Sequence, residues 1–327
     1  MKHSVIVGVD VSKATLDIFC LPSETFLQIA NNAAGFKKWL PELLGLCDCL
    51  DNLLIVMEHT GRYSYRLEEF LQAQGIAYVK IPALEIKRSL GVTRGKTDKI
   101  DARRIADYGW LRRDILETQE VLQPQFKQLQ SLLSTRKKLV TDRASYKARV
   151  KEMLETGSCP VNSLEVKIQR QIIKNFNASI KDVELEIQKI IRSTEALKKT
   201  YDLLTSIGGI GRLVATAMIC YTGNFKKFSN ARKFNCYAGI APFKHESGTS
   251  IRARSRVSHL ANKEAKALLN LAAFSAIRYN KELKNYYQRR VAEGKRKMSC
   301  INIIRAKLVS RMFAVVKRQT PYYELAA

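Results

Sequence analysis

The sequence has no cysteine or histidine pattern of the kind that holds zinc. Its seven cysteines are scattered, no two of them form a C-x2-C pair, and the four histidines stand alone. Zinc sites and disulfide frameworks need paired or regularly spaced ligands. We therefore expect ordinary buried or surface thiols in a reducing compartment.

Long apolar runs are also missing, although 46% of the residues are hydrophobic. No stretch approaches the ~18 to 20 residues that a membrane span needs. The first apolar stretch contains an acidic residue, which is the pattern of a first β-strand and not of a signal peptide. We expect a cytoplasmic protein without a membrane partner, and its 327 residues allow two or three packed domains.

Acidic residues are scarce in the last third of the chain. Residues 1–115 carry 16 Lys and Arg against 14 Asp and Glu, residues 116–200 carry 16 against 10, and residues 201–327 carry 24 against 6. Charge segregated in this way is typical of a surface that binds a polyanion. The basic segment has no single long basic amphipathic helix, so nucleic acid is favoured over an anionic membrane.

Hydrophobic periodicity divides the chain into three parts. In residues 1–115, three strand patterns precede alternating helices and strands, the order of an α/β ribonuclease-H-like fold. Two long amphipathic patterns follow, about 125–155 and about 163–204, joined by a Gly/Pro turn. They predict an antiparallel helical hairpin, either a plain structural arm or a stalk that contacts a second subunit or RNA. The pattern in residues 201–327 predicts a compact, mainly helical, basic domain.

Four carboxylates occupy positions from which they can converge. Asp10 and Glu58 each end a buried strand pattern, and these strands are neighbours in a ribonuclease-H-like sheet. Asp98 and Asp101 lie three residues apart at a helix start and share a face. Asp98 alone would serve as a helix N-cap, but the set predicts two Mg²⁺ ions ~4 Å apart that assist phosphodiester exchange. Nearby basic residues suited to a backbone phosphate are Lys96, Arg103 and Arg104.

A glycine-rich motif at residues 203–218 has the form of a helix-hairpin-helix. Its glycines allow a tight turn and let backbone N–H groups approach phosphates, helped by the N-terminus of the following helix. Such binding is independent of nucleotide sequence. The alternative is a plain glycine-rich connection between helices. The glycines are Gly208, Gly209 and Gly211.

A segment rich in Ser, Gly and Arg, residues 235–263, is the third candidate and predicts a flexible loop. A serine in such a loop could attack a phosphodiester while guanidinium groups meet the developing charge. Composition alone favours a simpler DNA-binding loop with incidental serines. The candidate nucleophile is Ser247, with Ser250, Ser255 and Ser258 as competitors and Arg252, Arg254 and Arg256 as the guanidinium groups.

Together these motifs resemble the DEDD recombinases of bacterial insertion elements, the insertion-sequence-110 family, which includes the Piv-type DNA invertases. GVDVSK around Asp10, MEHTG around Glu58 and KTDKIDA around Asp98 and Asp101 resemble the family's RuvC-like N-terminal domain. IGGIG and AGIAP…SGTSIRAR resemble its C-terminal transposase domain. The resemblance covers essentially the whole chain.

The resemblance implies a transposase that cuts and rejoins donor and target DNA. It implies a Mg²⁺-dependent DEDD site, a covalent phosphoserine at Ser247, a bridge RNA that pairs with both DNAs, and composite active sites in a dimer to tetramer. The corresponding domains are a RuvC-like domain at 1–115, a coiled-coil arm at 116–200 and a transposase domain at 201–327. Two alternatives remain open: a RuvC-like Holliday-junction resolvase that uses water as the nucleophile, and a non-catalytic nucleic-acid-binding protein.

Overall fold

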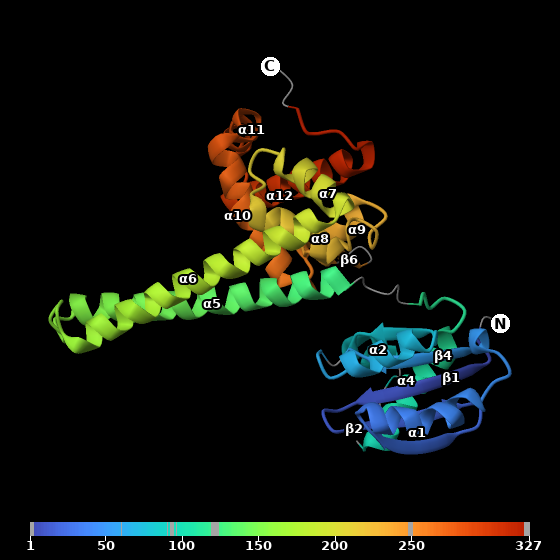
Figure 1. The fold of residues 1–327 in the computed structure, drawn as a ribbon. Helices are drawn as coiled ribbons and strands as arrows, with labels where there is room; N and C mark the ends of the chain where they lie inside the picture. Colours follow the sequence, from blue (N-terminus) through green and yellow to red (C-terminus); the bar gives the residue numbers. More distant parts are fainter. Residues whose placement is uncertain are drawn as a thin grey trace. The chain divides into compact units, whose positions relative to one another are not determined.

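The computed structural model describes residues 3–59, 61–89, 91, 95, 97–118, 124–247 and 251–323, with the backbone alone for 244–247 and 251–254. The chain forms two compact units, Met1–Val121 and Leu122–Ala327 (Figure 1). Residues 1–121 carry 16 basic and 16 acidic residues, whereas residues 122–327 carry 40 and 14. The whole net charge of +26 therefore belongs to the C-terminal unit.

The N-terminal unit is built on a five-stranded sheet with the order β3-β2-β1-β4-β5. The strands β1 (Val5–Val11), β2 (Thr15–Leu21) and β3 (Thr25–Ala30) form the antiparallel meander that the sequence predicts. The strands β4 (Leu53–Glu58) and β5 (Tyr78–Ile81) continue the sheet parallel to β1. This arrangement confirms the mixed α/β class of this part of the chain.

Helices cover both faces of this sheet, because the strands present apolar residues to each face. On one face, α1 (Ala33–Leu44) and α2 (Tyr65–Ala73) bury Trp39 and Leu67 against residues such as Val7 and Val9. On the other face, α4 (Asp98–Arg112) packs Ile105 and Tyr108 against β1 and β4. A 3-10 turn, Leu50–Asn52, precedes β4, and the short helix α3 (Ala83–Ser89), which the sequence pattern did not reveal, follows β5.

The C-terminal unit begins with a long helical hairpin. The helices α5 (Pro124–Glu155) and α6 (Leu164–Ser193) lie side by side along their length and form the arm that extends from the helical body (Figure 1). The second helix was expected to continue to about residue 204, and this prediction is wrong. Thr194 is extended, with φ −124° and ψ 120°, and a separate helix α7 (Glu195–Thr205) follows. The break lets apolar residues on both sides of it enter one core, which a straight helix would not allow.

The helical body consists of α7, α8 (Arg212–Thr222), α9 (Ala231–Tyr237), α10 (Lys263–Tyr279), α11 (Lys281–Ala292) and α12 (Lys297–Arg318). Its core includes Leu269 and Leu308 and extends to Phe126 and Ile187 at the base of the arm. This confirms a mainly helical C-terminal region. Among the described residues, no helix is both long and apolar enough to cross a membrane.

The segment 235–263 is not a continuous loop, contrary to the sequence prediction. Its first residues complete α9, and β6 (Pro242–Ser247) and β7 (Ile251–Val257) pair as an antiparallel hairpin. The alternating arginines of β7 were the overlooked signal, because a two-residue period is typical of strands.

Candidate active site and nucleic-acid interface

Asp10 and Glu58 lie at the same edge of the sheet, as the sequence predicts. Their strands are parallel neighbours, and Val9 is in register with Met57 just before the two acids. Gly8 faces α4, and alternate strand residues share a face, so Asp10 faces α4 as well. Both carboxylates are half-buried.

The helix α4 brings Asp98 and Asp101 to this face through an unusually close approach to the sheet. A Cβ built on Gly8 would lie 2.3 Å from the backbone nitrogen of Ala106, and one built on Gly109 would lie 2.7 Å from Cγ2 of Val56. Only glycine at these positions lets the helix pack so closely. The N-cap of α4 is Thr97, whose side chain accepts a hydrogen bond from the N–H of Ile100 at 3.3 Å. Asp98 is therefore not the N-cap and is left for another role.

The charges at this site act on Asp10. Burial is the largest cause of a pKa raised from 3.8 to about 6, and the carboxylates of Glu58, Asp101, Asp17 and Asp98 raise it further. The other three predicted acids thus lie within electrostatic reach of Asp10. Their mutual repulsion is the property that a bound cation would relieve.

Asp17 is a fifth carboxylate that the sequence argument missed. It is directly opposite Asp10 in the pairing of β1 with β2, and only 4% of it is exposed. Gln28 on β3 donates a hydrogen bond from Nε2 to its Oδ1 at 2.8 Å. The sequence contained a signal, because Asp17 stands among apolar residues of a strand, where a buried charge is costly unless it is compensated.

The donor set fits a hard divalent cation, although the side chains are not drawn together as ligands. Carboxylate oxygens are the ligands that Mg²⁺ prefers, and the repulsion of Asp10 by its neighbouring carboxylates favours a cation. Within the part of the chain that the structure describes, however, no three such side chains are close enough to form a metal-binding group. Asp101 is held by Arg104 at 3.0 Å, and Arg104 also donates to the carbonyl of Gly95 at 3.2 Å. Arg104 therefore occupies Oδ1 of Asp101, one of the two oxygens that this side chain could offer to a metal.

The basic residues that were expected to face a phosphate are engaged within the unit. Arg103 lies 3.2 Å from the carboxylate of Glu24 and 3.9 Å from that of Asp107, and its guanidinium stacks over the ring of Phe19. Arg104 pairs with Asp101 as described above. Lys96 lies outside the described residues.

In the C-terminal unit, the glycine motif forms a turn between α7 and α8, with two different kinds of glycine. Gly209 has φ +97°, and a Cβ there would lie 2.6 Å from Cβ of Ala276 on α10. Gly211, the residue before α8, is exposed, and a Cβ there would meet nothing within 4 Å. Gly208 is half-exposed. Gly209 thus serves packing, whereas Gly211 leaves the N-terminus of α8 open to a phosphate.

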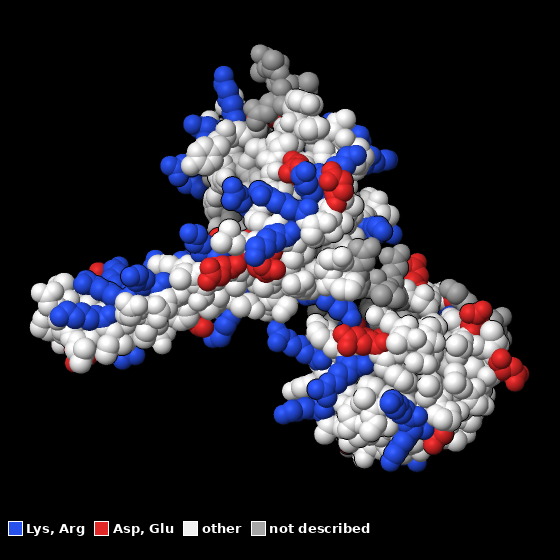
Figure 2. Space-filling view, viewed as in Figure 1, with Lys and Arg blue, Asp and Glu red and all other residues white. Residues whose placement is uncertain are grey.

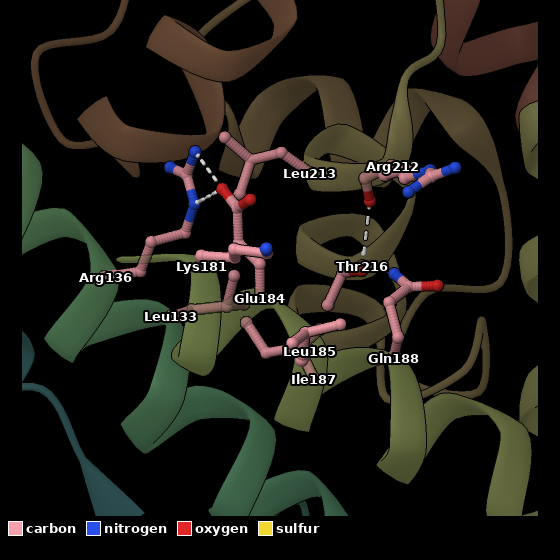
Figure 3. A pocket seen from close by; sticks show the side chains of 10 residues that line it. All are labelled: Leu133, Arg136, Lys181, Glu184, Leu185, Ile187, Gln188, Arg212, Leu213 and Thr216. Carbon is pink, nitrogen blue, oxygen red and sulfur yellow. Dashed lines mark hydrogen bonds and ion pairs between the residues drawn. The ribbon is translucent and has the colours of Figure 1, made fainter. Parts of the chain in front are cut away.

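A cavity of about 350 Å³ lies between the base of the arm and α8, beside this glycine turn (Figure 3). Four leucine and isoleucine side chains line it together with six polar or charged residues. Arg136 of α5 forms an ion pair with Glu184 of α6 at 2.7 Å, which ties the two arm helices together. Lys181 and Arg212 are the other cations of the lining. No sequence pattern indicates this cavity, because it is formed where α5, α6 and α8 pack together.

Basic side chains are spread over both the arm and the helical body on the face shown in Figure 2. Ser247 is the last residue of β6, and Ile251 is its partner in β7. Arg252, Arg254 and Arg256 occupy alternate positions of β7, and Arg256 is exposed. The side chains of Ser247, Arg252 and Arg254, like the whole of Gly248, Thr249 and Ser250, lie outside the described part.

Comparison with known proteins relates both units to one class. Residues 7–158 match a family model of DEDD transposases, and residues 201–288 match the model of the transposase IS116/IS110/IS902 family. The chain is 27% identical over 325 residues to the pilin gene-inverting proteins of Moraxella bovis and Moraxella lacunata, with 97% of each chain covered. It is 26% identical over 154 residues to an uncharacterized 43.6 kDa protein of insertion element IS110 from Streptomyces coelicolor, covering 46% of this chain and 38% of that one.

Proposed function

We propose a two-part active site for this chain, which belongs to the IS110 family of transposases and is therefore an enzyme that cuts and rejoins DNA. One part is the carboxylate set of the N-terminal unit, in a domain of RuvC-like fold. The other is the β6–β7 hairpin of the C-terminal unit, which carries Ser247. The observation that carries the proposal is the gathering of four carboxylates around Asp10, because a bound cation would relieve their repulsion.

The carboxylate part binds divalent metal, the dependence that the DEDD family suggests, and we propose two Mg²⁺ ions. Asp10, Glu58, Asp98 and Asp101 would hold them. When bound, such ions stabilise both the attacking and the leaving oxygen of a phosphodiester exchange. Asp17 touches none of the reacting atoms in this scheme, and its role is to position Asp10 and to add charge beside it.

The serine part supplies the nucleophile. The Oγ of Ser247 attacks the phosphorus, a P–O bond to one DNA strand end breaks, and the departing oxygen takes a proton. The chain then holds the other end as a phosphoserine, which conserves the bond energy so that a second strand end can displace the serine without an external energy source. Arg252, Arg254 and Arg256 on β7 meet the charge that develops at the phosphate.

The C-terminal unit also holds the nucleic acids. Its charge of +26 suits donor and target DNA together with a structured bridge RNA that pairs with both. The glycine turn and the N-terminus of α8 would bind backbone phosphates through Gly208 and Gly211. The arm would act as a coiled coil that joins subunits, in a dimer to tetramer whose active sites combine the two parts from different copies.

A serine variant tests the proposal on the full-length chain. Strand cleavage is measured with Mg²⁺, with DNA carrying the sequence that flanks the gene and with RNA transcribed from it. Ser247→Ala is expected to lose cleavage, whereas Ser250→Ala is expected to retain it and serves as the matched control. Cleavage by Ser247→Ala at a near-normal rate would instead indicate a RuvC-like resolvase, in which metal-bound water attacks.

A further inference from the structure

Arg305 of α12 is a buried cation with an incomplete set of partners. Only 4% of it is exposed. Its Nη2 donates to Oδ1 of Asn270 at 2.5 Å and its Nη1 to Oδ1 of Asn302 at 3.2 Å. Both acceptors are neutral amides, and its Nε has no hydrogen-bond partner within the described part of the chain. A buried guanidinium normally faces a carboxylate or a phosphate.

Lys266 of α10 adds a second cation beside Arg305. Burial lowers the pKa of Lys266, and the charge of Arg305 lowers it further. Burial also lowers the pKa of Arg305. Among the described residues, neither side chain forms an ion pair with a carboxylate. Two neighbouring cations without a carboxylate partner in the described part of the chain are the reverse of the carboxylate site, and an anion bound between them would be stabilised.

This pair lies at the foot of the β6–β7 hairpin. Asn302, which holds Arg305, also donates to the carbonyl of Ile240 at 2.7 Å, two residues before β6 begins. Gly239 has φ +64°, and a Cβ there would lie 3.9 Å from Nζ of Lys266. The AGIAP turn is thus packed onto the two cations. Five strand steps of ~3.3 Å separate Pro242 from Ser247, which is the reach of a few nucleotides.

We propose that Arg305 and Lys266 bind one backbone phosphate of the nucleic acid that the C-terminal unit holds, a few nucleotides from the phosphate that Ser247 attacks. This rests on the proposed function for the identity of the ligand. The anion accepts the hydrogen bond that Arg305 has left to donate, and it holds the nucleic-acid strand at the foot of the β6–β7 hairpin. The two residues are positioning residues, because they touch the nucleic acid away from the reacting atoms.

Thermal unfolding of the full-length chain tests the anion site without any cleavage. Inorganic phosphate is expected to raise the Tm of the C-terminal unit more than chloride does at equal ionic strength. Asn270→Asp puts a carboxylate where the amide of Asn270 now accepts from Arg305. This variant is expected to raise the Tm in chloride and to abolish the response to phosphate. Arg305→Gln is expected to lose the response as well.

Arg311→Gln is the matched control, because Arg311 lies on the same helix but already pairs with Glu282 at 2.6 Å. It is expected to keep the response to phosphate. If Asn270→Asp lowers the Tm and leaves the response unchanged, Arg305 is a structural residue and the site does not exist.

Duplex binding decides whether the anion belongs to nucleic acid. Arg305→Gln is expected to weaken DNA binding by roughly tenfold or more, as for a lost charge-assisted hydrogen bond. It should also reduce the slope of log affinity against log salt by about 0.9, the value for one duplex phosphate. A lost response to phosphate with an unchanged slope would overturn the assignment to nucleic acid. Both readouts are independent of Ser247, so failure here is distinct from failure of the serine mechanism.

Discussion

Replacing Asp10 by asparagine is expected to stabilise the N-terminal unit at neutral pH, although it removes a proposed metal ligand. The pKa of Asp10 rises from 3.8 to about 6 because of burial and four neighbouring carboxylates. At about 1.4 kcal/mol per pKa unit, the ionised side chain would cost ~3 kcal/mol. Asp10 is only half-buried, and solvent screening reduces the figure to about 1 kcal/mol. For this unit, that corresponds to a Tm higher by roughly 2–5 °C.

The sign of this effect depends on pH in a defined way. A carboxyl group whose folded pKa is raised is protonated in both states below its unfolded pKa, so it carries no penalty there. The penalty appears as pH rises from about 4 through about 6. The Tm gain of Asp10→Asn should therefore be present at pH 7.5 and absent below pH ~4.

Calorimetry of the full-length chain measures this difference, with Asp48→Asn as the control because Asp48 is exposed in the same unit. Mg²⁺ is expected to raise the Tm of the wild-type protein at pH 7.5 and to have little effect on Asp10→Asn. An Asp10→Asn variant that is less stable than wild type at pH 7.5, or equally responsive to Mg²⁺, would refute the reasoning.

Three further predictions concern residues that the sequence argument missed or did not distinguish from one another. Asp17→Asn removes one of the charges that raise the pKa of Asp10, so the acid limb of the pH–rate profile for cleavage should move to lower pH; an unmoved limb would show that Asp17 is only structural. Gly8→Ala places a Cβ 2.3 Å from the backbone of α4 and should destabilise the N-terminal unit by about 3 kcal/mol, as overpacking does, which a lowered Tm would reveal. Gly209→Ala meets Ala276 at 2.6 Å with φ +97° and should lower the Tm of the C-terminal unit, whereas Gly211→Ala should leave it unchanged; equal effects would contradict the division of roles in the glycine turn.

Much of the fold could be predicted from the sequence because its signals are local. The apolar runs of β1 and β2 and the three- and four-residue spacing of apolar residues in α5 can each be recognised within a short stretch of sequence. The break at Thr194 could not be predicted in this way. Ile190 and Leu197 are seven residues apart, so the helical pattern continues across the break, and only the shared core requires the bend.

The sequence argument found the acids of the candidate site that stand at the end of a strand or near the start of a helix. Asp10, Glu58, Asp98 and Asp101 follow this rule, and their strands and helix meet at one face. Asp17 was missed because it lies within a strand, where its relation to Asp10 depends on the register between β1 and β2. The partners of Arg103 and Arg104 also depend on side-chain packing. Spacing alone could not distinguish a cation paired with an acid from one that faces a phosphate.

Direct detection of a protein–DNA bond tests the central claim most directly. The full-length chain would be incubated with Mg²⁺, RNA and end-labelled DNA, denatured, digested and analysed by mass spectrometry. We predict a nucleotide attached through phosphate to the peptide that contains Ser247, retained in Ser250→Ala and absent from Ser247→Ala and Asp10→Asn. Cleaved DNA with free ends and no attached peptide would contradict the serine mechanism and assign the chemistry to water.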